Sequence, residues 1–199
     1  MRLNRLPRMF GAFVLLAITG FLSSCTNSQM QYVMDNYGYE NAYIPVGDSY
    51  LTLKNCSAYY YTGNISGDYL TSAQWSIVKA NSSSSNLNIG TSSVDTSNFR
   101  FYMYNTNDGY PAQNSYAYSN YQIYASFINY NQYYMTSYSL DQKKHVAIHE
   151  MGHTLGLDDI NADDVLNYTV MWHQYGTGFK TFTDYQDFDL ENIHWQYGE

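Results

Sequence analysis

The sequence predicts an α+β fold: a mixed, twisted sheet of about five strands with one packed helix, followed by a central helix and a C-terminal helix. Short segments rich in Tyr, Phe and Ile recur between residues 58 and 128, bounded by Ser, Asn and Gly, which is typical of strands. Helical segments with capping signals begin near residues 139 and 183. With 199 residues, of which 45% are hydrophobic, the chain is long enough for one domain with its own core.

The first 24 residues are predicted to be a signal peptide. Three arginines precede an apolar run from Phe10 to Leu22, which as a helix spans only about 20 Å of the roughly 30 Å bilayer core. Residues 22–25, Leu-Ser-Ser-Cys, resemble a bacterial lipobox, which implies lipidation of Cys25 and membrane attachment only through that lipid. We therefore expect an exported protein, either a cell-surface lipoprotein or a secreted one. A disulfide between Cys25 and Cys56 is the alternative use of the two cysteines.

Charge and composition exclude nucleic acid as a partner. Loss of the leader leaves six of the nine basic residues against seventeen acidic ones, a net charge of about −11 that repels nucleic acid and anionic lipid. The 24 tyrosines suit half-buried strands with an uncharged polar exterior. Residues 25–50 are polar without a clear period and are predicted to be a flexible tether. Residues 51–199 then form one domain, which we expect to be monomeric.

The first half of the domain is predicted to hold the sheet and its packed helix. Apolar residues recur at helical intervals in residues 68–78, and a serine-rich loop is expected at residues 81–86. Ile123, Ala125 and Phe127 alternate and are expected on one face of their strand. Strands are predicted around residues 58–62, from residue 87 onward and at residues 99–104, and residues 116–121 and 122–128 are expected to form one or two more.

A helix opening at Ser139 carries two histidines at metal-binding spacing. Ser139 and Gln142 are placed to form a capping box. His149 and His153 are four residues apart, so both imidazoles point to nearly the same side of the helix and can bind one zinc ion. Glu150 follows the first histidine and can act as a base beside the metal. This pattern predicts a catalytic zinc site.

A catalytic zinc has three protein ligands and one open position, and Asp159 is the predicted third ligand. In a continuous helix Asp159 would lie about 240° around the axis from His153 and face away. Gly156 can end the helix, because glycine adopts left-handed backbone angles without steric cost, and the turn then returns Asp159 to the metal. The neighbouring Asp158 is the alternative ligand.

The stretch His149-Glu150-x-x-His153-x-x-Gly156-x-x-Asp159 resembles the elongated zinc motif of the metzincin metalloproteases, in the form that ends in aspartate. The resemblance implies a zincin-like fold and one catalytic Zn²⁺ bound by His149, His153 and Asp159. It also implies a metallopeptidase that hydrolyses peptide bonds with activated water and with Glu150 as general base and acid. Its substrates would be extended proteins or peptides bound along a sheet edge, here residues 116–128.

Downstream features resemble the matrixin-like branch of the same family. Residues 169–173, Thr-Val-Met-Trp-His, look like the Met-turn beneath the zinc, which implies a structural role for Met171. His173 is a candidate transition-state donor, alongside Tyr175, although a surface histidine after a turn is an equal alternative. Thr183 is predicted to be the N-cap of the C-terminal helix, and Gly198 is predicted to end it.

The other polar residues are expected either to have a structural role or to be exposed to solvent. His145, one turn before the first zinc histidine, is expected to be exposed beside two lysines, and Cys56 to be a buried structural thiol. The acidic residues Asp158, Asp163 and Asp164 could attract Ca²⁺, yet a solvated loop explains them equally well.

Two other functions fit parts of the pattern. A gluzincin-type peptidase would use Glu191, on the later helix, as the third ligand and would leave Gly156 and Met171 without a role. A non-catalytic surface protein would contact glycans or host proteins through its tyrosines and hold a structural zinc, but such a closed site does not need Glu150. The leading hypothesis is a zinc-dependent endopeptidase.

Overall fold

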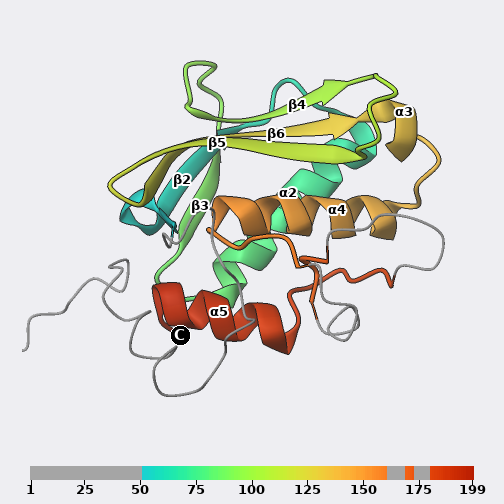
Figure 1. The fold of residues 1–199 in the computed structure, drawn as a ribbon. Helices are drawn as coiled ribbons and strands as arrows, with labels where there is room; N and C mark the ends of the chain where they lie inside the picture. The colour runs from blue at the N-terminus through green and yellow to red at the C-terminus, as the bar shows by residue number, and fades with distance from the viewer. Residues whose placement is uncertain (1–50, 161–168, 173–179) are drawn as a thin grey trace, which may run out of the picture.

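The computed structural model describes residues 51–160, 169–172 and 180–199. They form an α+β fold, as predicted. One face of the sheet is covered by α2 (Gly67–Ser83) and α4 (Leu140–Thr154), and α5 (Asp187–Tyr197) lies beneath them (Figure 1). Two short helical turns, η2 (Lys54–Cys56) and α3 (Gln132–Met135), lie beside strand ends.

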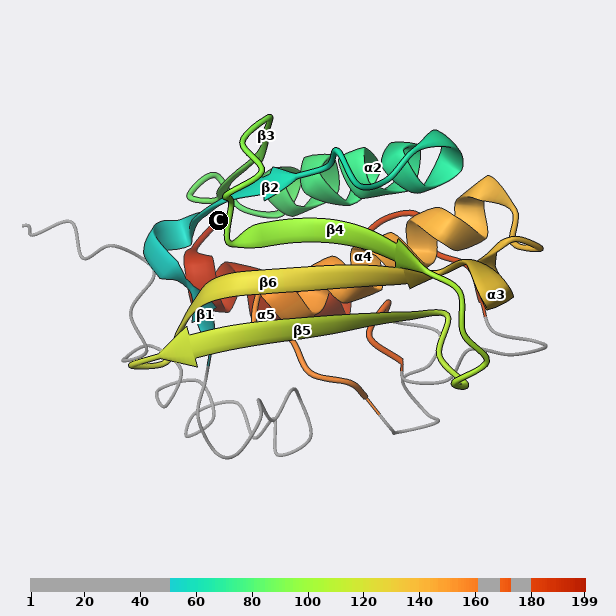
Figure 2. The ribbon, with the colours of Figure 1, turned by 90° about the horizontal axis from the view of Figure 1, so that it is seen from above.

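The sheet has six strands and is mostly parallel, so it holds one strand more than the sequence predicts. Its path runs β1-β6-β4-β2-β3, and β5 pairs with β6 in antiparallel orientation. β5 has no other partner among the described strands and forms an edge of the sheet (Figure 2). The strands are β1 (Thr52–Leu53), β2 (Ser57–Tyr61), β3 (Asn88–Ser92), β4 (Phe99–Tyr104), β5 (Ala112–Ser119) and β6 (Gln122–Asn131).

α2 is longer than predicted because its serines form hydrogen bonds within the helix. The helix runs to Ser83, so the loop expected at residues 81–86 is wrong for its first three residues. Ser72, Ser76 and Ser83 are buried, and each donates to a carbonyl of the preceding turn at 2.7–2.8 Å. Serine hydroxyls satisfied in this way are tolerated inside a helix. A serine-rich stretch therefore did not require a loop here.

β6 changes face at a β-bulge. Its register against β5 shifts after Ala117, and Tyr124 is the extra residue on β6. The prediction that Phe127 shares a face with Ile123 is therefore wrong, because one inserted residue reverses the alternation of side chains. Beyond the bulge the buried residues are Ser126, Ile128 and Tyr130.

α5 begins later than predicted. Its N-cap is Gln186 and its first residue is Asp187, so the prediction of Thr183 as N-cap is wrong. The backbone N–H of Gln186 donates to the Asp189 carboxylate at 2.8 Å, which satisfies a donor at the helix start. Thr183 instead accepts a hydrogen bond at its carbonyl from Nε1 of Trp75, at 2.7 Å.

Buried aromatic rings join the sheet to its helices. Tyr60, Phe101 and Tyr130 lie on the neighbouring strands β2, β4 and β6 and are fully buried. The ring centroid of Phe101 is 4.6 Å from that of Tyr60 and 5.8 Å from that of Tyr130. Tyr69 of α2 continues the stack at 6.0 Å from Tyr130. Part of the tyrosine content thus forms the core, where large rings remove much apolar surface from water.

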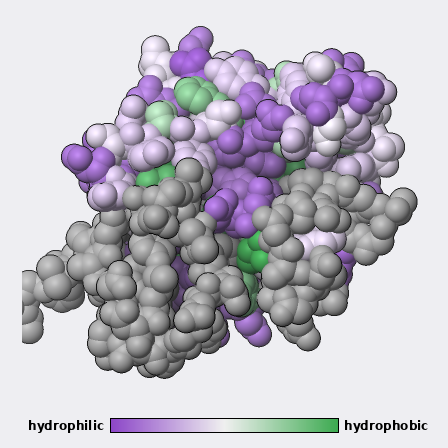
Figure 3. All heavy atoms as spheres, viewed as in Figure 1, coloured by the Kyte–Doolittle hydropathy of each residue, from purple (hydrophilic) through white to green (hydrophobic). Residues whose placement is uncertain are grey.

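The described surface is mostly hydrophilic in the view of Figure 3. No helix among the described residues combines the length and apolar character needed to cross a membrane.

Candidate metal centre

α4 presents two histidines and a glutamate beneath the sheet. The predicted capping box is present: the Gln142 N–H donates to Ser139 Oγ at 3.3 Å, and the Ser139 N–H donates to Gln142 Oε1 at 2.9 Å. The helix then runs through His149 and Glu150, which are buried, and His153, which is partly buried. The local sequence signals therefore place this helix correctly.

Gly156 ends the zinc-motif helix as predicted. The last helical residue is Thr154, and Gly156 has a φ of +87°, in the region that favours glycine. A Cβ at this position would collide with the backbone carbonyl of Leu51, which packs directly against the turn. Both the backbone angle and the close approach exclude a larger residue, and the turn reverses the chain toward Asp159.

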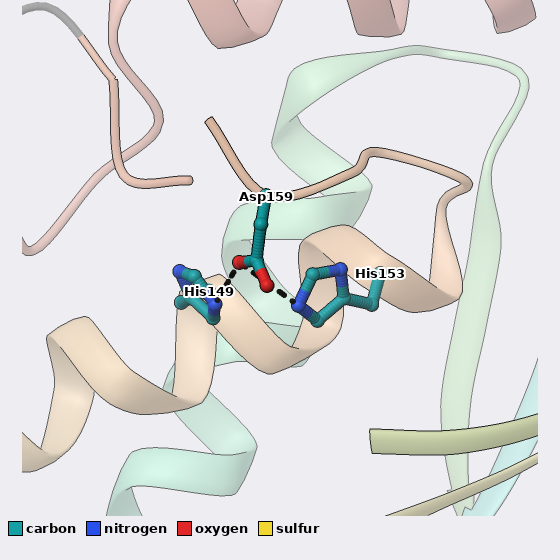
Figure 4. Close-up of side chains that lie close together, drawn as sticks. All are labelled: His149, His153 and Asp159. Carbon is teal, nitrogen blue, oxygen red and sulfur yellow. Dashed lines mark ion pairs between the residues drawn. The ribbon is translucent and has the colours of Figure 1, made fainter. Parts of the chain in front are cut away.

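The turn brings Asp159 to the two histidines (Figure 4). Asp159 Oδ1 lies 3.1 Å from His149 Nε2 and 3.6 Å from His153 Nε2. One ligand atom from each residue lies within 4.8 Å of the others. Zinc ligands at about 2.0–2.1 Å in tetrahedral geometry are about 3.3 Å apart. The three side chains therefore fit one zinc ion after only a small adjustment.

Backbone carbonyls orient both imidazoles for metal binding. His149 Nδ1 lies 2.9 Å from the Val170 carbonyl oxygen, and His153 Nδ1 lies 2.9 Å from the Leu157 carbonyl oxygen. A carbonyl only accepts, so Nδ1 of each ring is the donor, and Nε2 is the ring atom that a metal would bind. Such second partners hold metal-binding histidines in one tautomer and orientation.

Met171 packs beneath the zinc-motif helix. It is fully buried, and a Cβ added to Gly152 of α4 would overlap its sulfur. The Met171 carbonyl accepts a hydrogen bond from the Ile160 N–H at 2.8 Å, directly after the third candidate ligand. Met171 therefore supports the helix on one side and the ligand-bearing turn on the other.

Asp189 of α5 holds the segment around Met171, a role that was not predicted from the sequence. Its carboxylate accepts hydrogen bonds from Thr169 Oγ1 at 2.6 Å and from the Val170 N–H at 3.0 Å, and the residue is fully buried. Val170 in turn orients His149. The local sequence does not indicate this role, because an acidic residue in the first turn of a helix is common and needs no further explanation.

Glu150 is the buried carboxylate of the site, with only 3% of its surface exposed. Burial raises the pKa of Glu150 to about 7. The charge of His153 and a backbone hydrogen bond from Asn114 lower it, and the charge of Asp159 raises it. The Asn114 Nδ2 also donates to the Glu150 carbonyl at 2.7 Å. A carboxyl group with a pKa near neutrality can accept and release a proton at physiological pH.

His145 is buried, so the prediction that it is exposed is wrong. Only 5% of its surface is accessible, and its Nδ1 lies 3.1 Å from the backbone nitrogen of Phe182. The neighbouring Lys143 is buried as well and bonds Asp68 of α2 at 3.0 Å. The returning chain before α5 and the contact with α2 cover this face of α4, which helix periodicity alone did not reveal.

The remaining described candidates lie outside the cluster. Asp158 is partly buried, and its Oδ1 accepts the Asp159 N–H at 2.8 Å, so it orients the predicted ligand. Glu191, the alternative ligand, is exposed on α5 and does not join the His–His–Asp group. Cys56 is buried, as predicted, but it is disulfide-bonded, so the expectation of a free structural thiol is wrong.

Several predicted features lie outside the described residues. They are the signal peptide and tether in residues 1–50 with the lipidation candidate Cys25, the transition-state candidates His173 and Tyr175, and the calcium candidates Asp163 and Asp164.

Comparison with known proteins adds no family assignment: no family model matches the chain, and no curated protein matches it.

Proposed function

We propose that this chain is an exported zinc-dependent endopeptidase with a zincin-like fold of the matrixin-like metzincin type. The observation that carries the proposal is the cluster of His149, His153 and Asp159 ligand atoms within 4.8 Å of one another, beside a buried Glu150. A closed structural zinc site has no use for a buried carboxylate of this kind. The glycine turn after α4 and the buried Met171 support the metzincin resemblance.

Different residues of the chain supply proton transfer and ligand orientation in the proposed reaction. A bound Zn²⁺ supplies a Lewis acid that polarises the substrate carbonyl and makes water more acidic. Glu150 accepts the proton of the attacking water and delivers it to the leaving amine. The carbonyls of Val170 and Leu157 accept from Nδ1 of the two histidine rings and so direct Nε2 of each ring to the metal position. Proton transfer and ligand orientation are thus both supplied by α4 and the segments packed on it.

The edge strand β5 is the proposed binding place for the substrate. It runs antiparallel to β6, lies next to α4 and contains no charged residue. An extended peptide can add to such an edge through backbone hydrogen bonds, which depend little on sequence. We therefore propose protein or peptide substrates in extended conformation, cleaved at the cell surface or in the medium by a monomeric enzyme.

Digestion of a peptide library by the purified protein tests the activity. We expect cleavage that a chelator abolishes and Zn²⁺ restores. Glu150→Gln keeps the shape of the side chain but removes the base, and should lower kcat/KM about 10²–10⁴-fold while zinc content stays at the wild-type level. Equal, negligible cleavage by wild type and Glu150→Gln would overturn the proposal and favour a binding protein with a structural zinc.

Zinc content of two alanine variants tests the ligand set. Asp159→Ala should lose most of the bound zinc, because it removes one of three ligands, whereas Glu191→Ala should retain it, because that side chain is exposed on α5. The reverse result would replace the metzincin assignment by the gluzincin-type alternative.

A further inference from the structure

Asn114 of β5 binds the backbone of Glu150 through its side chain. Its Nδ2 donates to the Glu150 carbonyl at 2.7 Å, and its backbone N–H helps to lower the pKa of the Glu150 carboxyl group. The same Nδ2 lies 2.9 Å from Thr154 Oγ1, one turn further along α4. The edge strand is therefore joined to the helix at the level of the proposed base.

Buried hydroxyl groups fix the orientation of the Asn114 amide. Ser126 Oγ donates to Asn114 Oδ1 at 2.9 Å. The hydroxyl oxygens of Tyr60, Ser126 and Thr154 lie 2.8–3.0 Å from one another, and all three residues are fully buried. The Glu150 carbonyl can only accept, so the amide nitrogen must face it and the amide oxygen must face Ser126. A closed network of this kind allows a single arrangement of the amide.

The strand register directs the backbone of Asn114 to the outer edge of β5. The Asn131 N–H donates to the Pro111 carbonyl at 2.8 Å, so Pro111 faces β6. In an antiparallel pair, the N–H and C=O of one residue point to the same side, and the side alternates along the strand. The backbone groups of odd-numbered residues from Pro111 to Ala117 therefore face β6, and those of Asn114 face outward.

We propose that Asn114 is a positioning residue that aligns Glu150 with a substrate strand bound along the outer edge of β5; this inference rests on the proposed function. The backbone N–H and C=O of Asn114 both point to the outer side, where the C=O can accept a substrate N–H. The substrate backbone is then placed in register beside the base. Neither the strand nor the helix can shift without breaking the bonds between them.

Kinetic analysis of full-length variants tests this role. In Asn114→Ala, kcat should fall about 10–100-fold, because a misplacement of about 1 Å has an effect of this size. KM should stay within about twofold, since the backbone of β5 still pairs with the substrate. Bound zinc should remain at the wild-type level. Asn129→Ala is the matched control: the side chain of this asparagine, on β6, donates to the carbonyl of its neighbour Phe127, and the variant should keep the wild-type kcat.

Ser126→Ala separates positioning from general stability. Ser126 belongs to the same network but does not contact Glu150, so the variant should lower the melting temperature about as much as Asn114→Ala with a much smaller loss of kcat. If the alanine variant does not fold, Asn114→Asp replaces it in these measurements. Aspartate keeps the shape of the side chain and the oxygen that accepts from Ser126, but it lacks the amide N–H that donates to the Glu150 carbonyl. Equal losses of kcat in the Ser126 and Asn114 variants would overturn the inference.

Substrate binding supplies a second measurement that does not depend on turnover. In a Glu150→Gln background, the Kd of an uncut peptide should be the same within about twofold with and without Asn114→Ala, because the substituted side chain does not reach the substrate. A Kd raised tenfold would assign Asn114 to binding and overturn the positioning role. Absence of cleavage by the wild type would instead overturn the proposed function itself.

Discussion

His145 shows how one buried residue links stability to pH. Burial, together with the charge of His149, lowers its pKa to about 3, although a hydrogen bond with the Phe182 backbone acts in the opposite direction. The folded protein thus holds this ring neutral, while the unfolded chain binds a proton near pH 6.5. The stabilisation is complete above pH 6.5 and is lost as pH falls toward the folded-state value, by up to about 1.4 kcal/mol per pH unit.

Urea unfolding of the metal-free protein between pH 7 and pH 5 measures this effect. His145→Gln should be less stable than wild type at pH 7, but its free energy of unfolding should decrease less steeply with falling pH. His194→Gln, at a partly buried position of α5, is the control and should keep the wild-type slope. Parallel curves for wild type and His145→Gln would show that His145 does not contribute to the acid sensitivity.

At the scale of elements, α5 controls the segment that lies beneath the metal site. Asp189 accepts three hydrogen bonds, from Thr169 Oγ1 and from the backbone N–H groups of Val170 and Gln186. In Asp189→Asn we expect a loss of about 1.5–3 kcal/mol of stability, because bonds to a buried carboxylate are lost. Zinc should bind about 10–100-fold more weakly, because Val170 orients His149.

Zinc competition with a chromophoric chelator, together with thermal unfolding, checks this prediction. Asp187→Asn is the matched control, since it lies in the same turn of α5 but is exposed. If the two variants bind zinc equally well, α5 does not support the metal site.

For the whole molecule, a bound metal should stabilise the turn after α4, against which segments distant in sequence pack. The candidate ligands come from α4 and from the turn after it, which packs against Leu51 and the chain at Met171. Saturation at 1,000 times Kd stabilises the native state by about 4 kcal/mol, which corresponds to roughly 10 °C for a domain of this size. A chelator should therefore lower the melting temperature by about 10 °C.

Differential scanning fluorimetry with metal add-back identifies the ion. Zn²⁺ should restore the melting temperature of the chelated wild type, and Asp159→Ala should show almost no shift. Recovery with Ca²⁺ alone would mean that the acidic residues after α4, and not the His–His–Asp cluster, bind the stabilising metal.

Local features of the sequence were sufficient to predict the zinc-motif helix and its end. The capping box at Ser139, the spacing of His149 and His153 and the glycine turn at Gly156 all act within a few residues, so their geometry follows from helix periodicity and backbone sterics. The same reasoning placed Asp159 near the histidines. It also predicted the α+β class, because strand and helix periods are visible in short windows.

Only the tertiary structure decided which distant residues support that helix. Asn114, Asp189 and Phe182 contact the zinc-motif helix or the segment beneath it across 19 to 37 residues of chain, and their roles depend on strand register and on where α5 packs. The bulge at Tyr124 reversed the face of the strand beyond it, which no alternation of residue types indicated. Sequence periodicity reports the face that a residue occupies, but partners on that face are set by packing of the whole chain.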